Sequence, residues 1–321
     1  MAALAGSPRL VVLRALGLGD LLTALPALRA LADAFPDHCL LLAAPRELGP
    51  LARLSGVVDE IVDARPLEPL PDVLHGVELA VDLHGRGPES HRVLRRLEPG
   101  RLIAFANRAG GVPSGPRWRD DEHETARWCR LLEESGIAAD ASRLDLDPPP
   151  LRLPERWRGV TIVHPGAAAA ARRWPPERFA AVVRSERALG RSVAITGSRA
   201  ELSLAREVAR LAGIDGVAVL AGRTGLRDLV ALVAAAGRVV CGDTGIAHLA
   251  TALRTPSVVL FGPLSPDRWG PPPDRPWHRS IWAGRSGDPH ATAPARGLLA
   301  IEVAEVVDAL ASLPDAVPVA A

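Results

Sequence analysis

Short apolar runs alternate with amphipathic segments along the whole chain of 321 residues. In the first half, leucines recur every three or four positions from about residue 20 to 34, which is the spacing of one helical face. Helices are also predicted at 47–54 and 122–135, and buried strands at 10–13, 39–43, 60–62 and 79–83. Strands that alternate with helices pair in parallel through right-handed crossovers, so the pattern predicts a doubly wound α/β sheet.

The stretch LDLDPPPLRLP (144–154) interrupts this alternation. Stacked prolines exclude a helix or a central strand, so we predict a linker between a domain of residues 1–150 and one of 151–321. In the second half, strands are predicted at 160–163, 192–195, 217–220, 239–241 and 257–261, and helices at 176–189, 200–211, 226–235 and 301–313. Segment 265–295 is predicted to be a long loop and a candidate lid. Two doubly wound halves joined by a hinge predict a cleft, with ligands at the carboxyl ends of both sheets.

The most informative segment is 238–263, where an apolar run breaks at Gly-Asp-Thr-Gly and a helical pattern follows. A strand, a glycine turn and a helix N-terminus together form an anion site, because the first helical N–H groups lack intrahelical partners and carry partial positive charge. Asp243, Thr244 and Gly245 occupy this turn, and we predict that it binds a diphosphate. His248 falls one turn after Thr244 and either lines the same wall or packs in the core.

Asp20 follows the first predicted strand in the sequence RALGLGD. Its spacing favours a helix cap, but a carboxylate there could also take a proton from a substrate hydroxyl, and the two roles are compatible. A dinucleotide fold would need a third glycine where Leu22 stands, which argues against a dehydrogenase.

Two further groups of candidate residues precede predicted helices in the second half. Gly166 ends a strand and is followed by Arg172 and Arg173, which suits anion binding, although a solvated charge pair is an equal alternative. Glu201 either stabilises the first turn of a helix or accepts hydrogen bonds from the vicinal hydroxyls of a ribose.

Composition narrows the ligand chemistry further. Basic and acidic residues balance at 38 and 37, so nothing indicates a nucleic-acid partner. The chain has no lysine, so any phosphate clamp must be arginine. The three cysteines are scattered, and the Asp145–Asp147 pair lies in the linker, so we predict no metal site and no cofactor. The N-terminus has no basic region before its first apolar run, which predicts a cytoplasmic protein.

Four blocks, in this order along the chain, resemble glycosyltransferase family 9, the heptosyltransferase family. They are LVVLRALGLGDLLTALPALRALADAFPD (10–37), VELAVDLHGRGPES (77–90), TIVHPGAAAAARRWPPERFAAVV (161–183) and CGDTGIAHLATALRTPSVVLFGP (241–263). The resemblance implies a GT-B fold, in which two doubly wound Rossmann-like domains face each other across a cleft. The first domain would bind the acceptor and the second the nucleotide sugar.

The resemblance also implies metal-independent, inverting transfer, commonly from an ADP-heptose donor. By position in the motifs, Asp20 would be the catalytic base, with Gly19 and His84 on the acceptor side. Donor-binding positions would be Gly166, Arg172, Arg173, Glu201, Asp243, Thr244, Gly245 and His248. Arg172 takes a place usually held by lysine, which keeps the charge but changes the geometry.

We therefore interpret the chain as a glycosyltransferase that moves a sugar, with heptose from ADP-heptose as the leading donor, to a hydroxyl of a glycan, glycolipid or small-molecule acceptor. A lipid-linked acceptor would bring peripheral contact with a membrane. The alternatives are a nucleotide-sugar epimerase of the same fold and a non-catalytic nucleotide-sugar binder.

Overall fold

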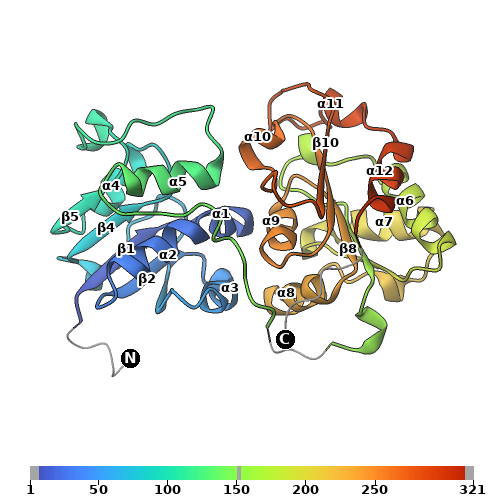
Figure 1. Ribbon diagram of the computed structural model, residues 1–321, viewed down its shortest axis with the longest axis horizontal. Helices are drawn as coiled ribbons and strands as arrows, with labels where there is room; N and C mark the ends of the chain where they lie inside the picture. Colours follow the sequence, from blue (N-terminus) through green and yellow to red (C-terminus); the bar gives the residue numbers. More distant parts are fainter. Residues whose placement is uncertain (1–6, 150–152, 315–321) are drawn as a thin grey trace. The chain divides into compact units, whose positions relative to one another are not determined.

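The computed structural model describes residues 7–149 and 153–314, which form two compact units (Figure 1). The division falls between Leu144 and Asp145. The expected boundary at residues 150 and 151 lies outside the described residues. Each unit contains a five-stranded sheet whose strands all pair in parallel. The doubly wound α/β architecture predicted from the alternating pattern is confirmed.

The sheet of the first unit has the strand order β3-β2-β1-β4-β5. Its strands are β1 (Arg9–Leu13), β2 (Cys39–Ala44), β3 (Glu60–Asp63), β4 (Leu79–Asp82) and β5 (Arg101–Ile103). Its α-helices are α1 (Leu18–Thr23), α2 (Leu25–Ala34), α3 (Gly49–Leu54), α4 (Glu89–Arg95) and α5 (Glu124–Glu133). Strands β1, β2 and β4 are almost completely buried, which explains their continuous apolar sequences.

Helices cover both faces of this sheet. Helices α2 and α5 pack against each other (Figure 1). On the other face, Val93 and Leu94 of α4 join Val11 and Leu13 of β1 in one buried cluster. Because side chains alternate along a strand, Leu10 and Val12 face the opposite layer, and β1 forms the centre of a three-layer unit.

The sheet of the second unit has the order β10-β9-β8-β6-β7. Its strands are β6 (Thr161–His164), β7 (Val193–Ile195), β8 (Arg238–Gly242), β9 (Ser257–Phe261) and β10 (His278–Trp282). Its α-helices are α6 (Pro176–Ala188), α7 (Leu202–Ala212), α8 (Leu226–Ala235), α9 (Gly245–Ala252), α10 (Pro266–Trp269), α11 (Arg296–Leu299) and α12 (Val303–Ala311). Helices α6, α7 and α12 share one buried cluster with the sheet, whereas α8 and α9 lie on its other side (Figure 1).

Three predictions of secondary structure were wrong. The helix expected from 20 to 34 is two helices, because Pro26 has no N–H with which to continue the hydrogen-bond ladder. The strand expected at 217–220 is instead a 3-10 turn, Gly216–Ala218, followed by a single bridge between Val219 and Ile195. Segment 265–295 contains α10 and the edge strand β10 rather than a continuous loop, and its action as a lid stays a prediction.

Both sheets have a topological switch point, where successive connections leave in opposite directions. In the first unit it lies between β1 and β4, and in the second between β6 and β8. Open parallel sheets bind ligands at such points, beyond the carboxyl ends of the strands. No helix within residues 7–149 and 153–314 is long and apolar enough to cross a membrane.

Candidate functional site

At the first switch point, Asp20 lies on α1, just after β1. Its Oδ2 atom accepts a hydrogen bond at 3.1 Å from the N–H of Gly17, which is the N-cap of α1. Asp20 is therefore the third residue of the helix and not its N-cap, although its side chain still stabilises the helix start. Its Oδ1 atom lies 3.4 Å from Nη2 of Arg14, and 28% of the Asp20 side chain stays exposed. A substrate hydroxyl can therefore reach a carboxylate that also orders its own loop. Gly19 is half-buried in the same turn of helix, and its role stays a prediction.

His84 follows β4 on the other side of this switch point. The buried Asp82 holds the turn, because its Oδ1 atom accepts hydrogen bonds from the N–H groups of His84 at 2.8 Å and Gly85 at 3.4 Å. Burial raises the pKa of Asp82 to about 6. Burial, together with the nearby charge of Arg14, lowers the pKa of His84 to about 4. His84 is therefore neutral at pH 7 and retains a nitrogen that can accept a hydrogen bond.

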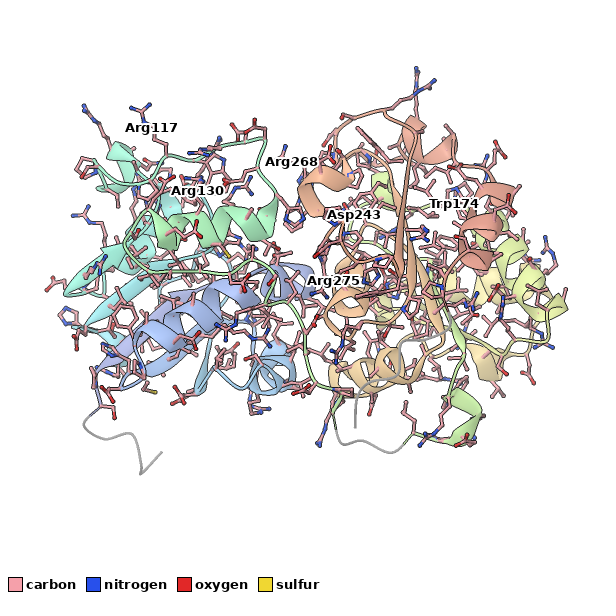
Figure 2. The ribbon with its side chains drawn as sticks, viewed as in Figure 1. Arg117, Arg130, Trp174, Asp243, Arg268 and Arg275 are labelled. Carbon is pink, nitrogen blue, oxygen red and sulfur yellow. The ribbon has the colours of Figure 1, made fainter. Side chains whose placement is uncertain are left out.

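At the second switch point, β8 leads into α9 through the predicted Gly-Asp-Thr-Gly turn. Figure 2 labels Asp243, whose side chain is 6% exposed. Thr244 has an extended backbone (φ −157°) and its side chain does not cap α9, so the first N–H groups of this helix are available to an anion. His248, one turn later, packs edge-on against Trp269 with 5.9 Å between ring centroids. Thr244, Gly245 and His248 are each half-buried.

Arg172 approaches this turn from the 3-10 segment Ala170–Arg172. Its Nη1 atom lies 3.5 Å from the carbonyl oxygen of Asp243 and 3.9 Å from that residue's Oδ2 atom. A Cβ atom on Gly242 would lie 2.7 Å from the carbonyl oxygen of Arg172, so this close approach requires glycine. Arg173 donates from Nε to the carbonyl oxygen of Ala167 at 2.9 Å. Both arginines are partly exposed and contact main-chain carbonyl oxygens, and donor binding by either of them stays a prediction.

Glu201 lies at the start of α7, after β7. Its Oε2 atom accepts a hydrogen bond from the Ser198 N–H at 2.7 Å, so the expected stabilisation of the helix start is present. The other oxygen lies over Gly166, where a Cβ atom would come within 2.2 Å of it. The structure therefore brings the ends of β6 and β7 into direct contact. Ribose binding by Glu201 stays a prediction.

Sequence reasoning left out three residues at these sites. His164, the last residue of β6, and Thr196, directly after β7, form a buried hydrogen bond of 2.9 Å between Nδ1 and Oγ1, and burial lowers the pKa of His164. Arg14 is 1% exposed and contacts both Asp20 of α1 and Leu83, directly after β4. A polar residue directly after a buried strand was the available signal for all three.

The candidate residues thus fall into two sets. Gly19, Asp20 and His84 follow β1 and β4 of the first unit. Gly166, Arg172, Arg173, Glu201, Asp243, Thr244, Gly245 and His248 follow β6, β7 and β8 of the second unit. Among the described residues, no group of three or more His, Cys, Asp or Glu side chains could hold a metal ion. Asp145 of the linker instead accepts a hydrogen bond from Arg275 at 2.6 Å.

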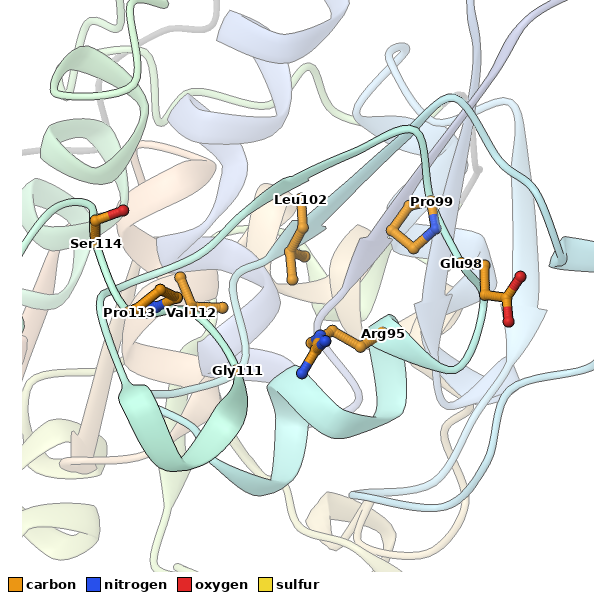
Figure 3. Close-up of a pocket in the computed structure, with 8 residues that line it drawn as sticks. All are labelled: Arg95, Glu98, Pro99, Leu102, Gly111, Val112, Pro113 and Ser114. Carbon is orange, nitrogen blue, oxygen red and sulfur yellow. The ribbon is translucent and has the colours of Figure 1, made fainter.

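A separate pocket of about 470 Å³ lies in the first unit, beside the edge strand β5 (Figure 3). Arg95 at the end of α4, Leu102 of β5 and the loop 111–114 line it, and the Arg95 side chain points toward Gly111. The residues of the two sets do not line this pocket.

Solved structures of known proteins share this fold. The structure of Escherichia coli ADP-heptose lipopolysaccharide heptosyltransferase II matches with a TM-score of 0.75 at 23% identity, covering 95% of this chain and 98% of that one. An E. coli heptosyltransferase solved with ADP matches with a TM-score of 0.73 at 16% identity, covering 94% and 99%. Together with the two parallel sheets, these matches identify the fold as GT-B.

Sequence comparison gives shorter but more similar matches. Lipopolysaccharide heptosyltransferase 2 of E. coli strain K12 is 36% identical over 107 residues, which are 32% of this chain and 31% of that protein. Lipopolysaccharide heptosyltransferase 3 of E. coli is 29% identical over 132 residues, covering 40% and 37%. These matches therefore span about a third of the length of each relative.

A family described as glycosyltransferase family 9 (heptosyltransferase) matches residues 121–293, more than half of the chain. That range includes all of the second set, from Gly166 to His248. It also includes the third and fourth of the four sequence blocks, so the resemblance to the family is confirmed, and the chain belongs to glycosyltransferase family 9.

Proposed function

We propose that this protein is an inverting, metal-independent glycosyltransferase that moves a heptose from ADP-heptose to a hydroxyl of a glycan or glycolipid acceptor. Membership of glycosyltransferase family 9 and the names of the relatives support this proposal. The match to the family lies mainly in the second unit, which we assign to the donor. We assign the acceptor to the first unit, which holds Asp20 and His84.

The N-terminus of α9 is the observation that carries the proposal. In the reaction, the bond between the anomeric carbon and the diphosphate oxygen breaks, and negative charge develops on the departing ADP. The N–H groups of Gly245 and Ile246 and the guanidinium of Arg172 offer donors to that charge, and such preorganised donors lower the barrier of group transfer. Arg172 already lies beside the Asp243 carboxylate, so an entering diphosphate would share this cation.

Asp20 supplies the other half of the chemistry. The acceptor hydroxyl attacks the anomeric carbon in line with the leaving group, forms the new C–O bond and loses its proton to the Asp20 carboxylate. Capping of Gly17 by Oδ2 fixes the orientation of that carboxylate, so the base is positioned before the acceptor binds. Neutral His84, at the neighbouring strand end, can accept a hydrogen bond from another acceptor hydroxyl.

We assign the ribose of the nucleotide to Glu201, whose carboxylate lies over Gly166 at the end of β6. Of the two matching structures, one is an ADP-heptose heptosyltransferase and the other was solved with ADP, which supports an adenine nucleotide. A lipid-linked acceptor would bring the first unit to a membrane surface, which we propose as a peripheral contact.

The test is a screen of ADP-, GDP- and UDP-sugars for thermal stabilisation, followed by a transfer assay with the stabilising donor. We expect ADP-heptose to raise the unfolding midpoint, and turnover to persist in EDTA. Product NMR should show the anomeric configuration opposite to that of the donor. Preference for a UDP-sugar, or its isomerisation without an acceptor, would favour the epimerase alternative instead. Binding without turnover of any acceptor would favour a non-catalytic binder.

A further inference from the structure

We infer that Arg14 is a positioning residue that fixes Asp20 and the His84 turn relative to each other. The inference rests on the proposed function, in which Asp20 is the base. Arg14 follows β1 directly and is 1% exposed, although it carries a permanent charge. A buried charge persists only where every donor finds a partner, so the partners of Arg14 indicate its task.

The guanidinium joins the two strand ends of the first switch point. Nε donates to the carbonyl oxygen of Asp20 at 3.0 Å, and Nη2 lies 3.4 Å from the Asp20 carboxylate. Nη2 also donates to Oγ1 of Thr23 at 3.3 Å, and Nη1 donates to the carbonyl oxygen of Leu83. Leu83 immediately precedes His84, so one planar group binds the segments that carry both candidate residues.

Glu124, the first residue of α5, supplies a carboxylate that balances the charge of Arg14. Its Oε1 atom accepts hydrogen bonds from Nη2 of Arg14 and from the indole N–H of Trp128, both at 3.0 Å. The guanidinium also lies over the Trp128 ring, 4.7 Å from its centroid. Glu124 is 110 residues from Arg14 in sequence, and α5 therefore clamps the guanidinium in one orientation.

Only arginine can serve in this place. Its N–H donors radiate in one plane from a rigid fork, and they match acceptors on four residues, Asp20, Thr23, Leu83 and Glu124. A lysine would keep the charge, but all its donors lie on one nitrogen atom. Loss of the fork would let the start of α1, which carries Asp20, move relative to the Leu83 carbonyl, while the donor residues of the second unit stay unchanged.

Arg127 offers a matched control. It pairs with the other oxygen of Glu124, lies 4.2 Å from the centroid of the Trp118 ring, and is 3% exposed. It also donates to the carbonyl oxygens of Arg119 at 3.1 Å and Glu122 at 3.0 Å. These contacts lie within residues 118–124. Arg127→Met therefore removes a buried network of similar size but leaves the hydrogen bonds between Arg14 and Asp20 in place.

The experiment compares Arg14→Met, Arg14→Lys and Arg127→Met in the full chain. We expect Arg14→Met to lower kcat about 100-fold, because small misplacements of catalytic groups have effects of this size. The dissociation constant for ADP, measured by calorimetry, should stay within about twofold of wild type, since positioning by Arg14 does not involve the donor site. Arg14→Lys should restore only part of kcat, and Arg127→Met should keep kcat within about threefold despite a comparable loss in Tm.

Hydrogen exchange at the Gly17 amide gives a readout that does not depend on turnover, because this N–H binds Oδ2 of Asp20. Protection should fall in both Arg14 variants and persist in Arg127→Met. Equal kcat in Arg14→Met and Arg127→Met, full activity in Arg14→Lys, or unchanged protection in the Arg14 variants would overturn the inference. A wild-type chain that transfers no sugar would instead contradict the proposed function, and exchange at Gly17 would still decide the role of Arg14. If Arg14→Met does not fold, Arg14→Lys supplies both readouts.

Discussion

The two switch points hold their candidate residues by different physical means. In the first unit, Asp20 and the His84 turn are tied together by one buried guanidinium, which is itself held by Glu124. In the second unit, glycines let the backbone come close, as where Gly166 meets the Glu201 carboxylate and Gly242 meets the Arg172 carbonyl. The residues at the first switch point are ordered by ion pairing between distant segments, and those at the second by close packing against glycine backbone.

The difference matches the two kinds of chemistry that we propose. A base must sit at a fixed distance from a hydroxyl, and a rigid guanidinium fork orients a carboxylate well. A diphosphate is large and bears charge on many oxygen atoms, so it is bound best by main-chain N–H groups and a helix terminus that nothing crowds. Changes in the first unit should therefore reduce turnover, and changes in the second should reduce donor affinity.

The largest effect is expected for Asp20→Asn. Removing the base should lower kcat by about 1,000-fold, because an amide cannot accept the proton. Affinity for ADP should not change. Asp228 accepts the same hydrogen bond from the Gly225 N–H, 3.1 Å from N to Oδ2, so Asp228→Asn measures the effect of replacing a capping carboxylate by an amide. Comparable kcat values for the two variants would remove Asp20 from the mechanism.

Arg172→Ala should have the next largest effect. Loss of a charge-assisted contact to the diphosphate should weaken ADP binding by about 10- to 100-fold, measured by calorimetry. Arg172→Lys should fall between Ala and wild type, because it keeps the charge without the fork. Arg184, an exposed residue on α6, is the control, and Arg184→Ala should bind ADP like wild type. Unchanged affinity in Arg172→Ala would place the diphosphate elsewhere.

Gly166→Ala should have a smaller effect that tests the role of close packing. The new methyl group would lie 2.2 Å from the Glu201 carboxylate, so Glu201 must move, at a cost of about 1–3 kcal/mol in stability. The affinity for ADP should fall together with stability, whereas α7 should still fold when ADP is absent. Gly216→Ala has open space around its Cβ atom and should leave both quantities unchanged. Wild-type affinity in Gly166→Ala would separate Glu201 from the donor.

The smallest effect concerns pH and Asp82. Because burial raises its pKa from 3.8 to about 6, the folded state binds a proton more tightly than the unfolded chain. Its contribution to stability is therefore greatest at low pH and is lost as pH rises from about 4 to about 6. Asp82→Asn should be more stable than wild type at pH 7, and the two should converge near pH 4. A constant difference across this range in urea titrations would contradict the assignment.

Most of the sheet scaffold could be predicted from the sequence, because buried parallel strands such as 239–241 are continuous apolar runs. Strands β5 and β10 were missed for physical reasons. Strand β5 has only three residues and begins with an exposed arginine, and β10 is an edge strand with the sequence HRSIW, whose exposed positions can be polar. Helix α4 was also missed, since its sequence ESHRVLR has too few apolar positions to show a periodic pattern.

The candidate site likewise contains residues that could be predicted from the sequence and residues that could not. The turn at 243–245 could be predicted because its glycines and helix start are local in sequence. The function of Arg14 could not, since its balancing partner Glu124 is 110 residues away and only the fold brings them together. Local patterns identify backbone anion sites, whereas buried ion pairs between distant segments require the structure.

Amide hydrogen exchange on addition of ADP tests most directly the assignment of the donor to the second unit. The account predicts new protection at the N–H groups of Gly245 and Ile246, at the start of α9, with no change at Gly17–Asp20. Protection concentrated at Gly17–Asp20, with α9 unchanged, would contradict it.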